Sequence, residues 1–83
     1  MKMIKFYADW CGPCKALSKT IDGAKDKIAI PIDEVDIDKE TSVAMQYGIR
    51  SVPTLMLVDE NGNILKRVSG TMNESQLLDF VKV

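Results

Sequence analysis

Apolar and polar positions along the 83-residue chain change their spacing several times, and each change predicts a new element. Residues 2–8 alternate and are rich in β-formers, which predicts a first strand. From Gly12 the alternation stops, and an apolar stripe at helical spacing predicts a helix that ends at about residue 26. Residues 28–38 predict a second strand with both faces covered. Because the proline at Pro31 cannot donate to a strand ladder, we expect this strand at an edge of the sheet.

A short helix and a terminal helix are predicted in the second half of the chain. The short helix spans residues 39–48. It is expected to start at Asp38 and to end at Gly48, since glycine adopts the left-handed conformation of a helix stop. Asn73 and Gln76 have the spacing of a capping box, which predicts the start of the terminal helix.

A β-hairpin is predicted between these two helices. Its β-rich arms, residues 54–59 and 63–69, flank Asn61-Gly62, a strong signal for a tight turn. The predicted order of elements is therefore βαβαββα. This order indicates an α/β fold, with one domain over residues 1–83 around a four-stranded mixed sheet.

Composition excludes several classes of function. Hydrophobic residues make up 46% of the chain and charged residues 28%, which is typical of a soluble globular protein. The net charge of -1 arises from intermixed charges, so no basic stripe is present to bind nucleic acid or anionic lipid. No apolar run is long enough to span a membrane, and no signal peptide is recognised at the start. We therefore expect a cytoplasmic protein without a membrane or nucleic-acid partner.

The stretch "ADWCGPCK" contains both cysteines, Cys11 and Cys14. A structural zinc site usually needs four Cys or His ligands, whereas this chain has two Cys and no His, so no metal site is predicted. A permanent disulfide across this loop would contribute only about 2 kcal/mol. A dithiol that opens and closes is favoured, because the pair lies where a strand ends and a helix begins. The helix N-terminus stabilises a thiolate at Cys11, which predicts Cys11 as the nucleophile and the shielded Cys14 as the resolving thiol.

The motif "WCGPCK" resembles the active-site motif of the thioredoxins, and further segments support this resemblance along the whole chain. "YGIRSVPTLMLV" is similar to the family segment that contains a cis-proline, and "GTMNESQLLDFV" to its glycine and terminal helix. The resemblance implies a minimal thioredoxin fold with sheet order 2-1-3-4 and helices on both faces. It also implies a monomeric protein-disulfide reductase whose redox group is the disulfide between its two cysteines. No other cofactor is implied.

Partners and docking residues are implied by the same resemblance. Electrons would arrive from a thioredoxin reductase-like flavoprotein and leave to cytoplasmic proteins that contain disulfides. The Val52-Pro53 bond would be cis, and the Val52 backbone would hold an extended substrate segment. The docking surface would comprise Trp10, Gly12, Pro13, Ile37, Val52, Pro53, Gly70 and Thr71. Simpler interpretations remain open: Trp10 could only shield the helix start, and Gly70 could only serve the geometry of a strand end.

The chain departs from the thioredoxin pattern in two ways. Thioredoxins usually begin with one more strand and helix, and the shorter pattern is similar to the minimal fold shared with glutaredoxins. They also carry a buried carboxylate six residues before the first cysteine and a nearby lysine, whereas this chain has Lys5 and Glu34 in these places. We predict that this charge-swapped pair exchanges protons with the resolving thiol. The alternative is that Lys5 simply extends to water.

Two rival functions remain open from the sequence. A glutaredoxin would use glutathione, although "SGTMN" lacks the acidic pair that often follows the glycine in glutathione-binding members. A binding subunit would use the same apolar surface without catalysis.

Overall fold

A four-stranded mixed sheet lies at the centre of the computed structural model, which describes residues 1–82. Strand β1 (Lys2–Tyr7) is parallel to β2 (Ile32–Asp36) and antiparallel to β3 (Thr54–Val58). Strand β4 (Ile64–Ser69) pairs antiparallel with β3. The order β2-β1-β3-β4 confirms the sheet that the resemblance implied.

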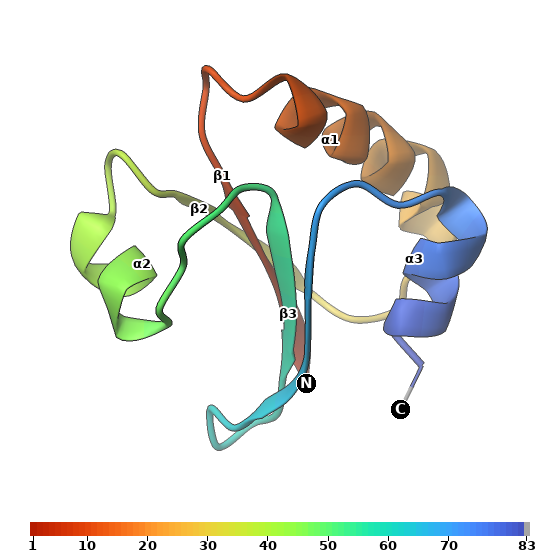
Figure 1. The fold of residues 1–83 in the computed structure, drawn as a ribbon. Helices are drawn as coiled ribbons and strands as arrows, with labels where there is room; N and C mark the ends of the chain where they lie inside the picture. The colour runs from red at the N-terminus through yellow and green to blue at the C-terminus, as the bar shows by residue number, and fades with distance from the viewer. Residues whose placement is uncertain (83) are drawn as a thin grey trace.

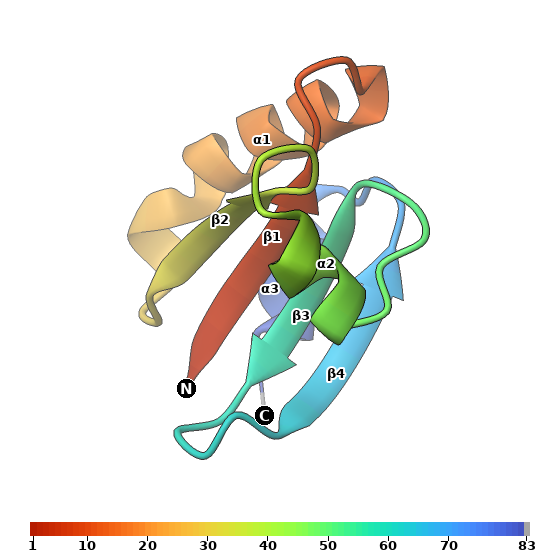
Figure 2. The ribbon, with the colours of Figure 1, turned by 90° about the vertical axis from the view of Figure 1, so that its left-hand side faces the viewer.

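Helices cover both faces of this sheet, as expected. Helix α1 (Gly12–Ala24), which continues into the short 3-10 helix η1 (Lys25–Lys27), lies beside α3 (Glu74–Phe80) on one face. Helix α2 (Thr41–Gln46) lies on the other face (Figures 1 and 2). The loops that lead into α1 and out of β4 lie at the same end of the sheet (Figure 1).

Side chains that alternate along β1 contribute to two hydrophobic clusters, one on each face of the sheet. Met3 packs with Leu17 and Leu77 between the sheet and the α1/α3 layer. Ile4 and Phe6 point to the other face, where they form a second cluster with residues of β2, β3 and α2. Lys5 shares the face of Met3, so its position in the strand directs a charged side chain under α1.

The second strand is shorter than predicted. Residues 28–31 lie outside β2, although the Pro31 carbonyl accepts a hydrogen bond from the Met3 N–H at 2.9 Å. Proline has no N–H to return, so the regular ladder begins only after it. The predicted edge position is confirmed. The prediction that both faces of this strand are buried is wrong, because Asp33 and Glu34 are exposed.

The short helix begins later than predicted, and Asp38 does not cap it. Glu40 occupies the cap position and makes no side-chain cap bond. The Asp38 carboxylate instead accepts a hydrogen bond from Trp10 Nε1 at 2.8 Å, while its backbone N–H donates to the Asp36 carboxylate at 2.9 Å. Gly48 ends the helix as predicted, with φ at +66°.

The predicted hairpin and capping box are both present. Gly62 adopts φ +84° in the turn, and its N–H donates to the Asp59 carbonyl at 3.1 Å. At the start of α3, the Asn73 side chain accepts from the Gln76 N–H at 2.8 Å, and the Gln76 side chain accepts from the Asn73 N–H at 2.9 Å. These local patterns set the turn between β3 and β4 and the start of α3.

Two neighbouring residues of β4 bind the C-terminal ends of helices on opposite faces. The Arg67 guanidinium donates to the carbonyls of Tyr47 and Gly48, each at 2.9 Å, where α2 ends. The Lys66 ammonium donates to the carbonyls of Phe80, at 3.2 Å, and Lys82, where α3 ends. Positive charge is favourable at a helix C-terminus, so each contact stabilises its helix.

Asp59 should make the stability of the hairpin depend on pH. Its carboxylate accepts hydrogen bonds from the backbone N–H groups of Asn63 and Asn61, each at 2.9 Å. These bonds, above all the one from Asn63, hold the pKa of Asp59 below its usual range. A carboxyl whose pKa is lowered on folding stabilises the fold above about pH 4, and this contribution disappears as the pH falls through the folded pKa. We expect Asp59→Asn to lower the Tm at pH 7 and to approach the wild-type Tm at low pH.

Thermal unfolding between pH 2 and pH 7 measures this effect. Asp22→Asn, at an exposed position on α1, is the matched control and should change little. A Tm gap between wild type and Asp59→Asn that stays constant over the whole pH range would contradict the prediction.

Candidate active site

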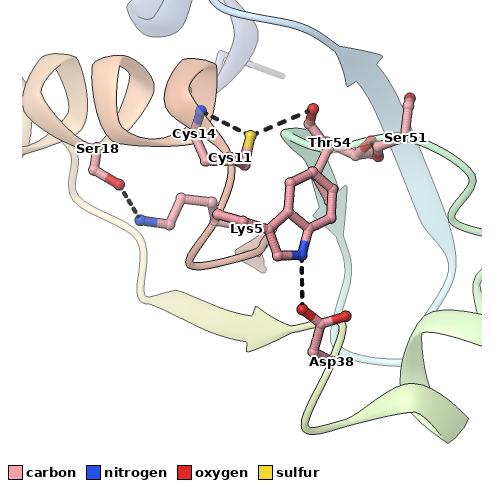
Figure 3. Close-up of a disulfide and its surroundings, with 9 residues drawn as sticks. Lys5, Cys11, Cys14, Ser18, Asp38, Ser51 and Thr54 are labelled. Carbon is pink, nitrogen blue, oxygen red and sulfur yellow. Dashed lines mark hydrogen bonds between the residues drawn. A yellow bond between two sulfur atoms is a disulfide. The ribbon is translucent and has the colours of Figure 1, made fainter.

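The two cysteines lie at the start of α1, immediately after β1. Cys11 is the N-cap residue, with extended backbone at φ -88° and ψ 109°, and Pro13 occupies the first turn, where its missing N–H is not needed. The Cys11 Sγ accepts a hydrogen bond from the Cys14 N–H at 3.1 Å, and the two sulfurs form a disulfide (Figure 3). After reduction, the same N–H and the helix dipole would stabilise a Cys11 thiolate.

Exposure does not distinguish the two cysteines. We expected Cys11 to be the more exposed one, but in the disulfide Cys11 is 3% exposed and Cys14 is 2% exposed. Both are buried in the disulfide because Tyr7, Ile37 and Val52 pack against the cluster that contains them. The surroundings do differ. The Cys11 Sγ lies 3.7 Å from the Val52 carbonyl oxygen, whereas Cys14 borders a cavity on the opposite side.

The residues predicted to dock substrates gather around Cys11. The Val52-Pro53 bond is cis, as expected, and the Pro53 carbonyl accepts a hydrogen bond from the Gly70 N–H at 2.9 Å. This bond places Gly70 beside the proline, and Thr71 lines a separate cavity between β4 and α3. Trp10, Gly12, Pro13, Gly70 and Thr71 are exposed, Ile37 and Val52 are half-buried, and Pro53 is buried.

Trp10 is the most prominent apolar side chain next to the dithiol. It is 69% exposed, so it is available for contact with another protein. Its indole N–H donates to Asp38 across the gap between two loops (Figure 3). This bond holds the ring beside the cysteines without burying it.

Lys5 and Glu34 are paired neighbours on β1 and β2, as predicted. The Lys5 Nζ lies 3.6 Å from Glu34 Oε1 and donates to Ser18 Oγ at 2.7 Å (Figure 3). Lys5 is only 4% exposed, so it does not extend to water, whereas the Glu34 side chain is 58% exposed. Both residues line a cavity of about 240 Å³ that Cys14 also lines. Lys5, Glu34 and Cys14 therefore share one cavity.

Two residues that the sequence analysis missed complete this environment. Ser18 follows Cys14 by four residues, so both lie on one face of α1, and this spacing could have revealed it. The Tyr7 ring centroid lies 5.3 Å from the Lys5 Nζ, a cation–π contact. Burial, followed by the negative charges of Asp36 and Glu34, raises the pKa of Tyr7. An uncharged phenol therefore forms part of the cavity wall at neutral pH.

Within residues 1–82, three or more His, Cys, Asp or Glu side chains are nowhere grouped to hold a metal ion. In the same part of the chain, no helix has the length and hydropathy needed to cross a membrane.

Comparison with known proteins agrees with this geometry. The family model Thioredoxin matches residues 1–83. The thioredoxin of Haemophilus influenzae is 32% identical over 81 residues, which cover 95% of this chain and 75% of that protein. The mitochondrial thioredoxin of Mus musculus is 35% identical over 82 residues, which cover 96% of this chain but only 49% of that protein.

A solved structure is also similar over nearly the whole chain. A mutant thioredoxin from Halobacterium salinarum superposes with a TM-score of 0.86 at 31% sequence identity. The match covers 99% of this chain and 75% of the other.

Proposed function

This chain belongs to the thioredoxin family and is a thiol-disulfide oxidoreductase, and we propose that it reduces protein disulfides in the cytoplasm with electrons from a thioredoxin reductase-like flavoprotein. The Cys11–Cys14 disulfide is the redox group. Exchange between thiols and disulfides requires no further cofactor. The protein acts as a monomer. Its basic and acidic residues are intermixed along the sequence and form no basic stripe, which favours proteins over nucleic acid as substrates.

The observation that carries this proposal is the position of the Cys11 sulfur. It accepts the Cys14 N–H at the start of α1 and lies beside the Val52 carbonyl that precedes cis-Pro53. In the reduced protein the Cys11 thiolate attacks a substrate disulfide, and one substrate sulfur leaves as a thiolate. The Cys14 sulfur then loses its proton and attacks Cys11, which releases the second substrate thiolate and restores the Cys11–Cys14 disulfide.

A docking surface around Cys11 supports protein substrates. The surface consists of Trp10, Gly12, Pro13, Ile37, Val52, Pro53, Gly70 and Thr71. The free backbone groups of Val52 would pair with an extended substrate segment, in the manner of strand addition. Trp10 would contribute apolar contact area at one side of the surface.

Lys5 and Glu34 act on the resolving thiol. The positive charge of Lys5 favours a thiolate at Cys14, and Glu34 moderates that effect because its carboxylate lies 3.6 Å from the Lys5 ammonium. Glu34 lies at the solvent edge of the shared cavity, so its carboxylate accepts the proton released by Cys14 and passes it to water. Lys5 thus stabilises the Cys14 thiolate by its charge, and Glu34 accepts the proton.

The choice of electron donor tests the proposed function. A thioredoxin reductase with NADPH should reduce the Cys11–Cys14 disulfide, and the resulting dithiol should reduce insulin. Turnover should be much slower with glutathione and glutathione reductase. Rapid turnover only with glutathione would instead indicate a glutaredoxin. Full biological activity of the double variant Cys11→Ser, Cys14→Ser in a deletion strain would indicate a binding subunit.

A further inference from the structure

We propose that Ser18 is a positioning residue for the resolving step. Its hydroxyl holds the Lys5 ammonium on the Cys14 side of the shared cavity, where the ammonium stabilises the thiolate that forms on Cys14. This inference rests on the proposed function of the dithiol.

Ser18, which accepts a hydrogen bond from Lys5, is nearer to the ammonium and better shielded than Glu34, its ion-pair partner. The Lys5 Nζ lies 2.7 Å from Ser18 Oγ but 3.6 Å from Glu34 Oε1. The Glu34 side chain is 58% exposed, so water screens its attraction for Lys5. The bond to Ser18 is the stronger constraint, because a charged donor meets a half-buried acceptor at hydrogen-bond distance.

The two partners hold Lys5 toward different elements. Ser18 lies on α1, four residues after Cys14 and on the same helix face. Glu34 lies on β2, at the edge of the sheet. Without the hydroxyl, the flexible lysine side chain would pair with Glu34 alone and move from the helix toward the sheet edge. Ser18 therefore determines how strongly the Lys5 ammonium stabilises a thiolate at Cys14.

The role of Ser18 belongs to the second half of the catalytic cycle. In that step the Cys14 S–H bond breaks, the Cys14–Cys11 bond forms, and the bond between Cys11 and the substrate sulfur breaks. The substrate leaves as a thiolate, and the proton from Cys14 passes to solvent. A nearby ammonium lowers the energy of the Cys14 thiolate. The first attack by Cys11 depends instead on the helix N-terminus, so Ser18 should affect it little.

Other groups around the cavity set the background against which Ser18 acts. The titratable groups that line the cavity besides Cys14 are Lys5, Tyr7, Asp9, Lys15 and Glu34. They come from β1, the following loop, α1 and β2, and Ser18→Ala replaces none of them and directly breaks a hydrogen bond to Lys5 alone. A shift in the pH profile of Ser18→Ala therefore reports the position of Lys5.

The two attacks can be separated in one stopped-flow experiment with 5,5′-dithiobis(2-nitrobenzoate). The reduced protein releases one nitrothiobenzoate when Cys11 attacks the reagent and a second when Cys14 resolves the mixed disulfide. Ser18→Ala should slow the second release by about tenfold near pH 7 and shift the midpoint of its pH profile upward by about one unit. The first release should stay close to the wild-type rate.

Three matched variants give the controls. Ser18→Thr keeps the hydroxyl and should restore the second release. Thr20→Ala removes a hydroxyl of α1 that binds the Ala16 carbonyl, and it should behave as wild type. Ser18→Ala should have no further effect in a Lys5→Met protein, because the hydroxyl acts through the ammonium.

Each other outcome overturns the inference. An unchanged second release in Ser18→Ala would mean that the hydroxyl is dispensable. Equal slowing of both releases, or an undiminished effect in Lys5→Met, would indicate a general structural role. If the wild-type protein itself releases only one nitrothiobenzoate, the proposed function of the dithiol fails before Ser18 is tested.

Discussion

Replacing Cys11 by serine should abolish insulin reduction, with a loss of at least about a hundredfold to the uncatalysed background. A serine hydroxyl at the N-cap still accepts the Cys14 N–H, so α1 should remain intact. It is not ionised at neutral pH, however, and does not attack a disulfide. The measurement is the rate of insulin precipitation with dithiothreitol as the electron source.

Replacing Cys14 by serine distinguishes the two cysteines. The variant should still form a mixed disulfide through Cys11 but should not resolve it, so covalent complexes with substrate should accumulate on non-reducing gels. Stable complexes in Cys11→Ser but not in Cys14→Ser would reverse the assigned roles. Thr20→Ala, which leaves both sulfurs in place, serves as the control for both assays.

Reversing the charge at Lys5 should cause the second large loss. One unit charge at about 7 Å and an effective dielectric constant of about 20 changes the ionisation of a thiol by about 2.4 kcal/mol, or roughly 1.7 pKa units. Lys5→Asp replaces an attractive charge with a repulsive one and also sets a carboxylate beside Glu34. We therefore expect a higher pKa of the Cys14 thiol and less Cys14 thiolate at pH 7. Insulin reduction should become slower by more than about tenfold.

The double variant Lys5→Asp, Glu34→Lys tests whether the two side chains act together. It restores an ion pair in the opposite orientation and should recover activity that Lys5→Asp loses. The readouts are the thiol pKa values, from the absorbance of the thiolate, and the rate of insulin reduction for wild type, both single variants and the double variant. Strictly additive losses across this cycle would contradict coupling between the two residues.

Local patterns in the sequence predicted the elements well where a short stretch determines its own geometry. Gly48, Gly62 and the Asn73 capping box depend on neighbours within a few residues, and all are as predicted. Asp38 was assigned to the wrong partner because its carboxylate binds Trp10, which is 28 residues away. A cap and a tertiary hydrogen bond compete for the same oxygen, and the sequence does not show which one wins.

Only part of the candidate site was predictable from the sequence. The Lys5–Glu34 pair followed from the alignment with the thioredoxin pattern, and in the structure the two residues are register partners on β1 and β2. The burial of Cys11 depends on Val52, which is distant in sequence, and the Ser18 contact depends on the rotation of α1 over the sheet. Side chains that meet only through packing between layers give no periodic signal.

The contacts of Lys66 and Arg67 affect how the molecule opens. Because neighbouring side chains of one edge strand hold the ends of α2 and α3, detachment of β4 would free the last turns of both helices at once. Local unfolding commonly occurs in such linked segments rather than residue by residue. β4, the end of α2 and the end of α3 would therefore exchange their amide hydrogens as one cooperative unit. They would do so although α2 and α3 lie on opposite faces of the sheet.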